Sequence, residues 1–383
     1  MKLFHISDLH IGLKLLNRDL VEDQVYILDQ IVKLAVDRQP DVVLIAGDIY
    51  DKAIPSAEAV EVFDRFISDL TERCPEAEIM MISGNHDSAP RIDCFRSILS
   101  RQKVHMIGRP PQKEGEYIEK VTLTDDNGPV HFYLLPFVKP SMVKQITGTQ
   151  ENGNNLSYDE TLHRLIAREN IDRSERNVLV SHQFYLPVGT KAEEIKWAES
   201  EIHTVGNIDQ VSSDVLEPFD YAALGHIHKP MKVGSEFWRY SGTPIACSVS
   251  EAGQEKGIIE VDLGPKGEVQ TSVLPLKPLR EVRVIEGAFL DVLEQGCRDY
   301  VTVILTDKED LNIIDMQERV RDAFPYLLEI RRQKAGYRSR QISMEEQETL
   351  TPYELCLAFL TDLSEREKDI LKDVINTVEE GTE

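Results

Sequence analysis

The stretch Val42–Asp51 has the sequence VVLIAGDIYD, in which a strand-length apolar run ends abruptly at Gly47 and Asp48. The same arrangement recurs along the first 230 residues: a run typical of a buried strand is followed at once by side chains that commonly bind metals. The other runs and their motifs are Lys2–Ser7 before Asp8-Leu9-His10, Glu78–Ser83 with Gly84-Asn85-His86-Asp87, Asn177–Ser181 before His182, and Tyr221–Leu224 before Gly225-His226-Ile227-His228. A sixth apolar run, His131–Leu135, carries no such motif.

Helical patterns separate these runs. Leu20–Val36 and Ala57–Leu70 have apolar residues at the spacing of an amphipathic helix, and Ser157–Glu160 is a capping box that opens another. Alternation of strands and helices predicts an α/β core with substantial parallel pairing. Because ligands bind at the carboxyl ends of strands in such sheets, we expect the motifs to converge on one point.

The residue types in the motifs indicate a pair of divalent metal ions. Imidazole and carboxylate ligands without thiolate suit Mn, Fe or Zn better than Mg or Ca. The candidate ligands are Asp8, His10, Asp48, Asn85, His182, His226 and His228. If Asp48 bridges and the other six divide evenly, each ion has four protein ligands. His86 is then placed to stabilise a phosphoryl transition state or to protonate the leaving oxygen.

Each motif has a simpler interpretation when it is taken alone. Asp-x-His occurs by chance, and Gly-Asp or Gly-Asn-His-Asp at a strand end can be an ordinary turn. Their joint occurrence, each at a strand end, favours the metal site. Asp51 and Asp87 are expected to fix loops or to orient ligands rather than to bind metal. The remaining histidines are expected to be structural or on the surface: His5, His105, His131, His163 and His203.

The character of the sequence changes after about residue 278. Strands are predicted at Glu281–Ile285, Tyr300–Leu305 and Leu327–Arg332, and a helix is predicted at Asp310–Ala323. We therefore expect a catalytic domain over residues 1–278, a small α+β domain over 279–335 and a polar linker over 336–350. Capping patterns at Thr351–Glu354 and Ser364–Glu367 predict a helical hairpin over residues 351–383, with an apolar stripe that includes Ile370 and Val374.

Composition limits the possible classes of protein. The chain has 383 residues, 43 Lys and Arg against 67 Asp and Glu, and a formal net charge of −24, which argues against coating nucleic acid or anionic membrane by charge alone. No apolar run approaches the roughly 20 residues that span a bilayer, and the first residues are not typical of a signal peptide. The five widely spaced cysteines predict neither a disulfide framework nor a thiolate zinc site. These features favour a cytoplasmic enzyme.

The ordered motifs closely resemble those of the calcineurin-like metallophosphoesterase superfamily, which are Asp-x-His, Gly-Asp, Gly-Asn-His and Gly-His-x-His. Within it, the chain is similar to the SbcD-like nuclease subunits over most of its length. Stretches that carry this similarity include Ile6–Gly12, Gly47–Ala59, Ile82–Pro90, Phe219–His228, Tyr240–Pro244, Ser250–Gly257 and Pro275–Arg283.

The resemblance implies a two-sheet β-sandwich flanked by helices, a capping domain at 279–335, and Mn-dependent cleavage of DNA phosphodiesters in the processing of DNA ends and hairpins. It implies that Asp8, His10, Asp48 and His228 hold one ion, that Asp48, Asn85, His182 and His226 hold the other, and that His86 is catalytic. It also implies an SbcC-like coiled-coil ATPase partner that docks on the C-terminal helices, and a homodimer within a heterotetramer. The chain itself has no Gly-x-x-x-x-Gly-Lys-Ser/Thr loop for ATP.

Rival functions use the same metal core. A protein phosphatase is disfavoured, because relatives of that type continue from Gly-Asp into Asp-Arg-Gly, whereas this chain has Ile49-Tyr50-Asp51. A scaffold with a decayed site is disfavoured, because no expected ligand is missing. A phosphodiesterase for cyclic nucleotides or other small phosphoesters remains the alternative, although it explains the C-terminal additions poorly.

Two surface features have open interpretations. Lys14, Lys52, Arg91 and Lys229 each follow a ligand motif within about five residues, so they form either a cationic rim for DNA or ordinary solvated loops. The apolar stripe of the hairpin packs either on its own catalytic domain or on a partner helix, which the intervening polar linker favours. The acidity of the chain predicts that it holds DNA weakly when alone.

Overall fold

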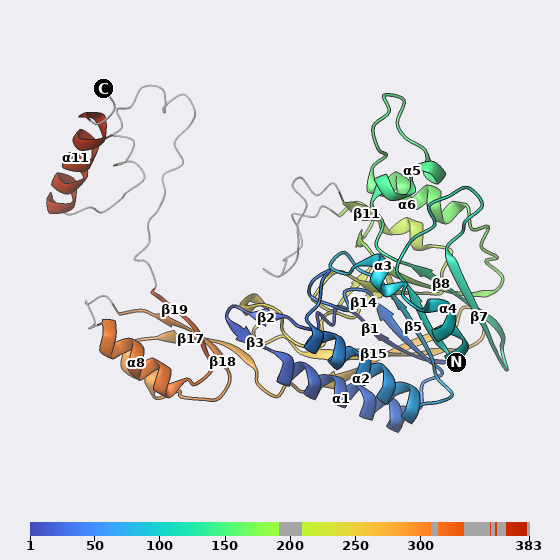
Figure 1. Cartoon of the computed structure of the whole chain (residues 1–383), viewed down its shortest axis with the longest axis horizontal. Coiled ribbons are helices and arrows are strands. Elements are labelled where there is room, and N and C mark those ends of the chain that lie inside the picture. The colour runs from blue at the N-terminus through green and yellow to red at the C-terminus, as the bar shows by residue number, and fades with distance from the viewer. Residues whose placement is uncertain (191–208, 308–312, 333–352, 354–356, 358–364, 381–383) are drawn as a thin grey trace. The chain divides into compact units, whose positions relative to one another are not determined.

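A computed structural model describes residues 1–190, 209–307, 313–332, 353, 357 and 365–380 (Figure 1). The predicted linker at 336–350, most of the first helix of the predicted hairpin, and His203 lie outside these residues. The described part divides into two compact units, Met1–Val284 with Arg298–Val301, and Ile285–Cys297 with the chain from Thr302 onward. No helix in this part is both long and apolar enough to cross a membrane.

The first unit is built on two six-stranded sheets. The first sheet has the order β16-β15-β1-β4-β5-β6, in which β1, β4, β5 and β6 run parallel, β15 pairs antiparallel with β1, and β16 pairs antiparallel with β15. Its strands are β1 (Lys2–Ile6), β4 (Val42–Ala46), β5 (Glu78–Ile82), β6 (Val104–Ile107), β15 (Lys256–Leu263) and β16 (Val269–Leu276).

The second sheet has the order β13-β14-β12-β9-β8-β7, with β14, β12, β9 and β8 parallel and an antiparallel strand at each edge. Its strands are β7 (Glu119–Asp125), β8 (Gly128–Leu135), β9 (Arg176–His182), β12 (Tyr221–Gly225), β13 (Met231–Val233) and β14 (Ser235–Tyr240). Two small pairs complete the unit: β2 (Lys14–Leu15) with β3 (Arg18–Asp19), and β10 (Phe184–Leu186) with β11 (Gln210–Ser212).

Three apolar cores hold the layers together, and the alternation of side chains along β4 explains the arrangement. Val42, Leu44 and Ala46 enter a core shared with β8, β9 and β12 of the other sheet, whereas Val43 and Ile45 face a core shared with helices. Both faces of β4 are therefore buried, which is why its sequence is continuously apolar. A third core lies between the second sheet and α6 (Tyr158–Ala167), through residues such as Leu162 and Leu165.

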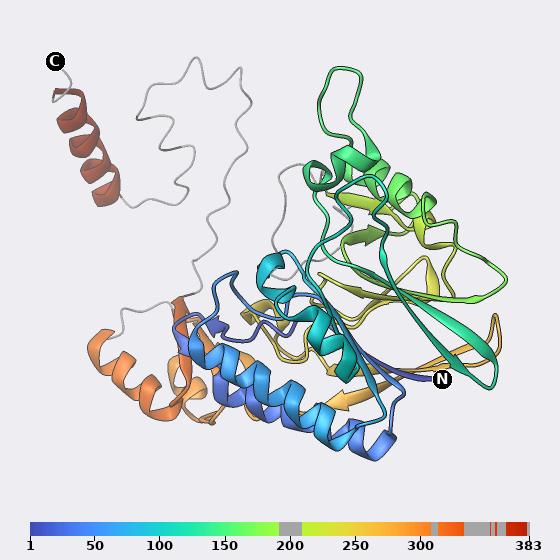
Figure 2. The same ribbon diagram turned by 45° about the vertical axis from the view of Figure 1, so that its right-hand side comes forward.

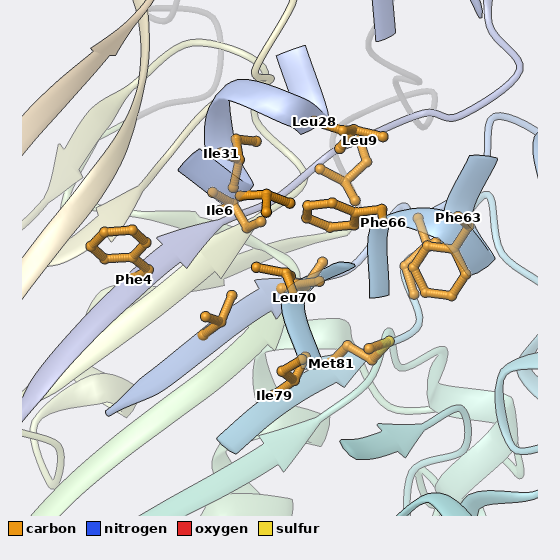
Figure 3. Close-up of a cluster of buried hydrophobic side chains, with 14 of the residues drawn as sticks. Phe4, Ile6, Leu9, Leu28, Ile31, Phe63, Phe66, Leu70, Ile79 and Met81 are labelled. Atoms are coloured by element: carbon orange, nitrogen blue, oxygen red, sulfur yellow. The ribbon is translucent and has the colours of Figure 1, made fainter. Parts of the chain in front are cut away.

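Helices α1 (Val21–Arg38) and α2 (Ala57–Arg73) lie side by side on the first sheet (Figures 1 and 2). Ile31 of α1 and Phe66 of α2 lie close to Ile6 of β1 in the core that the helices share with the strands, as Figure 3 shows. Ser56 accepts a hydrogen bond from Ala59 N at 3.1 Å and so caps α2. The shorter helical segments of this unit are α3 (Ala89–Ile92), α4 (Arg96–Leu99), η1 (Ser100–Gln102), α5 (Pro140–Thr147), η3 (Ser213–Leu216) and η4 (Val249–Glu251).

The C-terminal part contains a three-stranded sheet in the order β17-β18-β19, formed by Val282–Gly287, Tyr300–Leu305 and Leu327–Arg332. Its helices are α7 (Phe289–Leu293) and α8 (Ile313–Ala323). A final helix, α11, spans Glu365–Glu380. The predicted fold class, a two-sheet α/β core with helices on its outer faces, is confirmed.

Candidate dimetal site

The predicted ligands come from five strand ends and meet in one place. β1, β4 and β5 are neighbours in the first sheet, and β9 and β12 are neighbours in the second, so the loops that follow them share one edge of the sandwich. Asp48 lies at the centre of the group. Its Oδ2 is 3.3 Å from His182 Nε2 and 3.7 Å from His10 Nε2. The structure therefore brings side chains from both sheets together around one carboxylate.

The backbone at these residues is held in an uncommon conformation. Asp8 (φ 53°), His10 (φ 43°), Asp48 (φ 48°) and His226 (φ 105°) account for four of the nine non-glycine residues with positive φ in the described chain. Such conformations cost roughly 1–3 kcal/mol each and collect at functional sites. Paired loops hold them in place: Asp8 N donates to Gly47 O and His10 N donates to Asp48 O, each at 3.0 Å.

Glycines make the close approach of these loops possible. A Cβ atom on Gly84 would lie 2.0 Å from Asp48 Oδ1, and one on Gly47 would lie 2.4 Å from His182 Nδ1. A Cβ atom on Gly225 would meet the carbonyl oxygen of Ala46 at 2.0 Å. These three glycines are therefore required by the close packing of the loops that carry the ligands, and not by turn geometry alone.

Hydrogen bonds set the orientation of the imidazoles. His182 Nδ1 lies 2.8 Å from Ala46 O, so its Nε2 is directed at the site, 3.0 Å from Asn85 Oδ1. The Nδ1 of His226 reaches the same Asn85 oxygen at 3.0 Å. A backbone carbonyl that accepts from one ring nitrogen fixes the tautomer and leaves the other nitrogen as a ligand.

The donor atoms fit a divalent cation. His10 Nε2 and His228 Nε2 face each other at 3.2 Å, so at most one of the two nitrogens can carry a proton without two N–H groups facing each other. Among the described residues, four sets of potential ligand atoms lie within 4.8 Å of one another: Asp8-His10-His228, Asp8-Asp48-His182, His10-Asp48-His86 and His228-Cys247-Glu251. Nitrogen and oxygen ligands without sulfur favour Mn, Fe or Zn.

Electrostatics in the buried site also favour a bound cation. Burial lowers the pKa of His10 and of His226 to about 3, which keeps both rings in the neutral form that binds metal. Burial would raise the pKa of Asp48, but His182 and His10 outweigh it, and the pKa lies well below its usual value. Burial would likewise lower the pKa of His182, but the Asp48 carboxylate raises it to about 9. The buried carboxylate thus requires positive charge beside it.

His86 lies next to the ligands and has a different set of contacts. Its backbone N donates to Asp48 Oδ1 at 2.9 Å, and its Nδ1 lies 2.9 Å from Asp51 O. The ring meets His10 edge-on with centroids 4.8 Å apart. Because the Asp51 carbonyl can only accept, Nδ1 carries a proton and Nε2 is the nitrogen available for proton exchange.

Asp87 fixes the loops and Asp51 contributes its backbone carbonyl. The Asp87 carboxylate accepts from the backbone N of Gly84 at 2.9 Å, of Ile49 at 3.0 Å and of Tyr50 at 2.9 Å. It therefore joins the loop after β5 to the loop after β4. The four predicted rim residues are Lys14, Lys52, Arg91 and Lys229, and all of them are exposed.

The described histidines outside the motifs have partners of their own. His5 is fully buried and contacts Tyr221 OH at 2.9 Å, while His105 contacts Glu78 at 2.8 Å. His131 pairs with Glu175 at 2.5 Å, and His163 lies 3.2 Å from Asp214. None of these four lies in the described group of potential ligands around Asp48.

Three residues beside the site were not predicted from the sequence. Ser7 Oγ donates to Asp8 Oδ2 at 2.5 Å. The Glu251 carboxylate lies 3.6 Å from His228 Nδ1, and Lys256 donates to Glu251 at 2.6 Å. Ser7 precedes a motif directly and could have been suspected for that reason. Glu251 and Lys256 follow no ligand motif and no spacing rule indicates them, but both lie in the stretch Ser250–Gly257 that carries the family resemblance.

Comparison with known proteins places this site in a family. Residues 1–230 match the family described as calcineurin-like phosphoesterase. The chain belongs to the calcineurin-like phosphoesterases. This confirms the superfamily that the motifs predicted, and with it a hydrolase for phosphoesters. Residues 278–363 match a second family, SbcD_C, described as the type 5 capsule protein repressor C-terminal domain.

Individual proteins are also similar to this phosphoesterase. It is 28% identical to the D subunit of the SbcCD nuclease of Staphylococcus epidermidis over 390 residues, which cover 99% of each chain. Among solved structures, TT1561 of Thermus thermophilus and a dimetal phosphatase from Danio rerio each have a TM-score of 0.39. Each is 13% identical, with 71% of this chain and 98% of the other covered.

Proposed function

We propose that this chain is the nuclease subunit of a DNA-processing complex and hydrolyses DNA phosphodiester bonds with two metal ions. The observation that carries the proposal is the convergence of six side chains with nitrogen and oxygen ligand atoms, from both sheets, around Asp48. Similarity to an SbcCD nuclease subunit over 99% of both chains supports DNA as the substrate class.

The ligands divide into two sets that share Asp48. We assign Asp8, His10, Asp48 and His228 to one ion, which agrees with the 3.2 Å between the facing Nε2 atoms of His10 and His228. Asp48, Asn85, His182 and His226 are assigned to the other, in which both histidines approach Asn85 Oδ1 at 3.0 Å. Two divalent ions, which we propose to be Mn²⁺, would acidify a water nucleophile and neutralise charge on the phosphate.

His86 supplies the proton-transfer group in this proposal. Its Nδ1–H is directed at the Asp51 carbonyl, so in the imidazolium form the proton on Nε2 can pass to the leaving 3′ or 5′ oxygen, which leaves the neutral Nδ1–H ring behind. The bond from its backbone N to Asp48 Oδ1 holds the residue in a fixed place beside the bridging carboxylate. The same ring can donate a hydrogen bond to a phosphate oxygen whose charge increases in the transition state.

Binding of the duplex backbone is assigned to Lys14, Lys52, Arg91 and Lys229 as a cationic rim. Their exposure and their closeness in sequence to the ligand motifs support this role. Lys14 lies 3.8 Å from Asp19, so part of its charge is already compensated. The rim is therefore small, and it suits positioning of one phosphate region rather than tight binding of a long duplex.

Partner binding is assigned to the C-terminal helices, and α11 supports the assignment. Ile370 and Val374 lie one helical turn apart on α11 and are 55% and 53% exposed, which is unusual for large aliphatic side chains. We propose that they dock on an SbcC-like coiled-coil ATPase, which supplies the nucleotide-binding loop that this chain lacks.

The same proposal covers the domains and the assembly. Residues 279–335 form the capping domain, residues 336–350 the linker and residues 351–383 the helical hairpin. Two copies of the chain dimerise within a heterotetramer in the cytoplasm.

The test uses one preparation of the chain and varies the metal, the substrate and the presence of the partner. Purified chain, stripped of metal, is assayed with Mn²⁺ or EDTA on linear duplex DNA, hairpin-ended DNA and a small phosphodiester, with and without the ATPase partner and ATP. Mn²⁺-dependent cleavage of DNA that the partner stimulates is the expected result. Turnover of the small phosphodiester with no cleavage of DNA under any condition would favour the cyclic-nucleotide or small-phosphoester alternative.

A further inference from the structure

A buried ion pair lies directly behind one of the proposed ligands. Glu251, at the end of η4, and Lys256, at the start of β15, are 1% and 6% exposed. Lys256 Nζ donates to Glu251 Oε2 at 2.6 Å. The other carboxylate oxygen, Oε1, lies 3.6 Å from Nδ1 of His228. The pair thus connects β15 to the loop after β12 that carries His228.

The polar atoms of this cluster satisfy one another. Thr243 Oγ1 accepts from Lys256 at 2.8 Å and donates to Glu251 Oε2 at 3.1 Å. Ser248 Oγ donates to Glu251 Oε1 at 3.2 Å, and Cys247 N approaches the same oxygen at 3.3 Å. With so many contacts, the carboxylate has little freedom to rotate away from His228.

Stability alone is a weak explanation for such a pair. Replacing a buried ion pair by well-packed apolar side chains is often neutral or stabilising, because desolvation of two charges offsets their attraction. A third metal site is also a poor explanation, although His228, Cys247 and Glu251 lie close together. Burial and the Glu251 carboxylate raise the pKa of the Cys247 thiol, and the Lys256 ammonium already occupies the position next to the carboxylate.

We infer that Glu251, held in place by Lys256, is a positioning residue that orients His228 toward the metal and selects its Nδ1–H tautomer. A proton on Nδ1 faces the carboxylate, so the lone pair is on Nε2, the atom that faces His10 Nε2 at 3.2 Å. His182 is oriented in the same way by a backbone carbonyl, Ala46 O. The Glu251 carboxylate therefore has the same role for His228 as the Ala46 carbonyl has for His182.

Glu251→Gln changes the chemistry without changing the size of the side chain. Lys256 and Cys247 N both can only donate, but the Lys256 ammonium is charged and lies at 2.6 Å against 3.3 Å for Cys247 N, so it draws the amide oxygen toward itself and turns the amide NH₂ toward His228. The NH₂ group can only donate too, so His228 would accept on Nδ1 and carry its proton on Nε2, where the metal should bind. The inference rests on the proposed dimetal site, and it concerns the ion that His228 holds.

The experiment titrates Mn²⁺ into metal-stripped full-length chain by calorimetry. For Glu251→Gln we expect one of two ions to bind about 10–100-fold more weakly, in line with loss of an orienting partner. Glu260→Gln is the matched control, because Glu260 is a buried carboxylate on the same strand β15 that contacts Ser272 and Arg38 instead. It should bind both ions as the wild type does.

A second variant separates positioning from folding. Glu251→Met combined with Lys256→Met removes both charges, so thermal unfolding of the metal-free protein should stay near wild type while the weak Mn²⁺ affinity remains. Recovery of wild-type affinity in this double variant, or unchanged affinity in Glu251→Gln, would overturn the inference.

The tautomer can be read without any metal. In ¹⁵N-histidine-labelled, metal-free protein, His228 should carry its proton on Nδ1 in the wild type and on Nε2 in Glu251→Gln. The same tautomer in both proteins would also overturn the inference. A wild-type chain that shows the expected tautomers but binds no Mn²⁺ would instead contradict the proposed function and leave the role of Glu251 in orienting His228 supported.

Discussion

Gly84→Ala should disable the site by a displacement whose size follows from the structure. The new methyl carbon would lie 2.0 Å from Asp48 Oδ1 and 2.4 Å from Asp48 N, whereas Cβ atoms essentially never approach other atoms closer than 3.0 Å. Asp48 and Gly84 must therefore separate by about 1 Å. Rotation of the Asp48 side chain cannot relieve the contact, because the backbone nitrogen is also too close.

The expected loss follows from that displacement. A shift of about 1 Å at a reacting centre can cost about 100-fold in rate, equivalent to about 2.7 kcal/mol of transition-state stabilisation. Asp48 Oδ1 also accepts from His86 N at 2.9 Å, so both the bridging ligand and the catalytic group should move. We expect at least a 100-fold fall in kcat/KM on a small phosphodiester with Mn²⁺, together with fewer than two ions bound per chain.

The assay needs a control that distinguishes crowding at the site from the general effects of adding a methyl group. Gly84 has an ordinary φ, so backbone strain does not contribute, and Gly287 provides the matched case with its closest contact at 3.4 Å, to Val292 Cγ2. Gly287→Ala should keep full activity and gain up to about 1 kcal/mol of stability. If Gly84→Ala bound two ions and turned over at the wild-type rate, the proposed role of Asp48 at the centre of the site would be refuted.

The other perturbations address catalysis, stability and assembly in turn. His86→Ala should lower turnover by about 10²–10⁴-fold. Because the backbone N–H to Asp48 is retained, two bound ions should still be measured by metal analysis, and loss of an ion would contradict the proton-transfer role. Asp125→Asn should destabilise the fold by about 1.5–3 kcal/mol at neutral pH, since Asp125 pairs with the buried Arg176 guanidinium. The Arg176 hydrogen bonds hold the pKa of Asp125 well below its usual value, so this stability is present above the unfolded pKa near 3.9 and is lost as pH falls below it. Denaturant unfolding should accordingly show wild type and variant converging in acid, and a gap that widened there would contradict the assignment. Ile370→Glu with Val374→Glu should abolish binding of the ATPase partner in a pull-down while small-phosphodiester turnover is unchanged, and retained binding would place the partner surface elsewhere.

Strands buried on both faces are among the parts of the fold that could be predicted. β4 packs Val42 and Leu44 into one core and Val43 and Ile45 into another, so its sequence is apolar throughout and both of its ends were predicted correctly. β7 was not predicted. It is an edge strand on which partly buried side chains alternate with exposed ones, in the sequence EKVTLTD. Such a strand forms because it pairs with β8, and a local sequence pattern does not reveal that pairing.

The same distinction applies to the site. Residues such as Asp8 and His226 were recognisable because metal chemistry restricts the types of side chain and parallel strands restrict where they lie. Glu251 and Lys256 were missed because neither restriction applies to them. They form a pair of charges of the kind usually found on the surface, and they are buried here because β15 passes behind the loop that carries His228. The resemblance included their stretch, Ser250–Gly257, but only the tertiary structure shows that the pair is buried beside His228.

The net charge of −24 has a measurable consequence for DNA binding. Each phosphate that a cationic side chain neutralises contributes about −0.9 to the slope of log affinity against log salt concentration. A rim of four cations, one of them already near Asp19, therefore predicts a slope no steeper than about −3.6 for the isolated chain. Addition of the ATPase partner should steepen the slope, because the partner would supply the remaining phosphate contacts. Filter binding across a salt series measures both values. An isolated chain with a slope as steep as about −8 would require a cationic surface well beyond Lys14, Lys52, Arg91 and Lys229. The proposal that this chain cleaves DNA while the partner holds it would then be wrong.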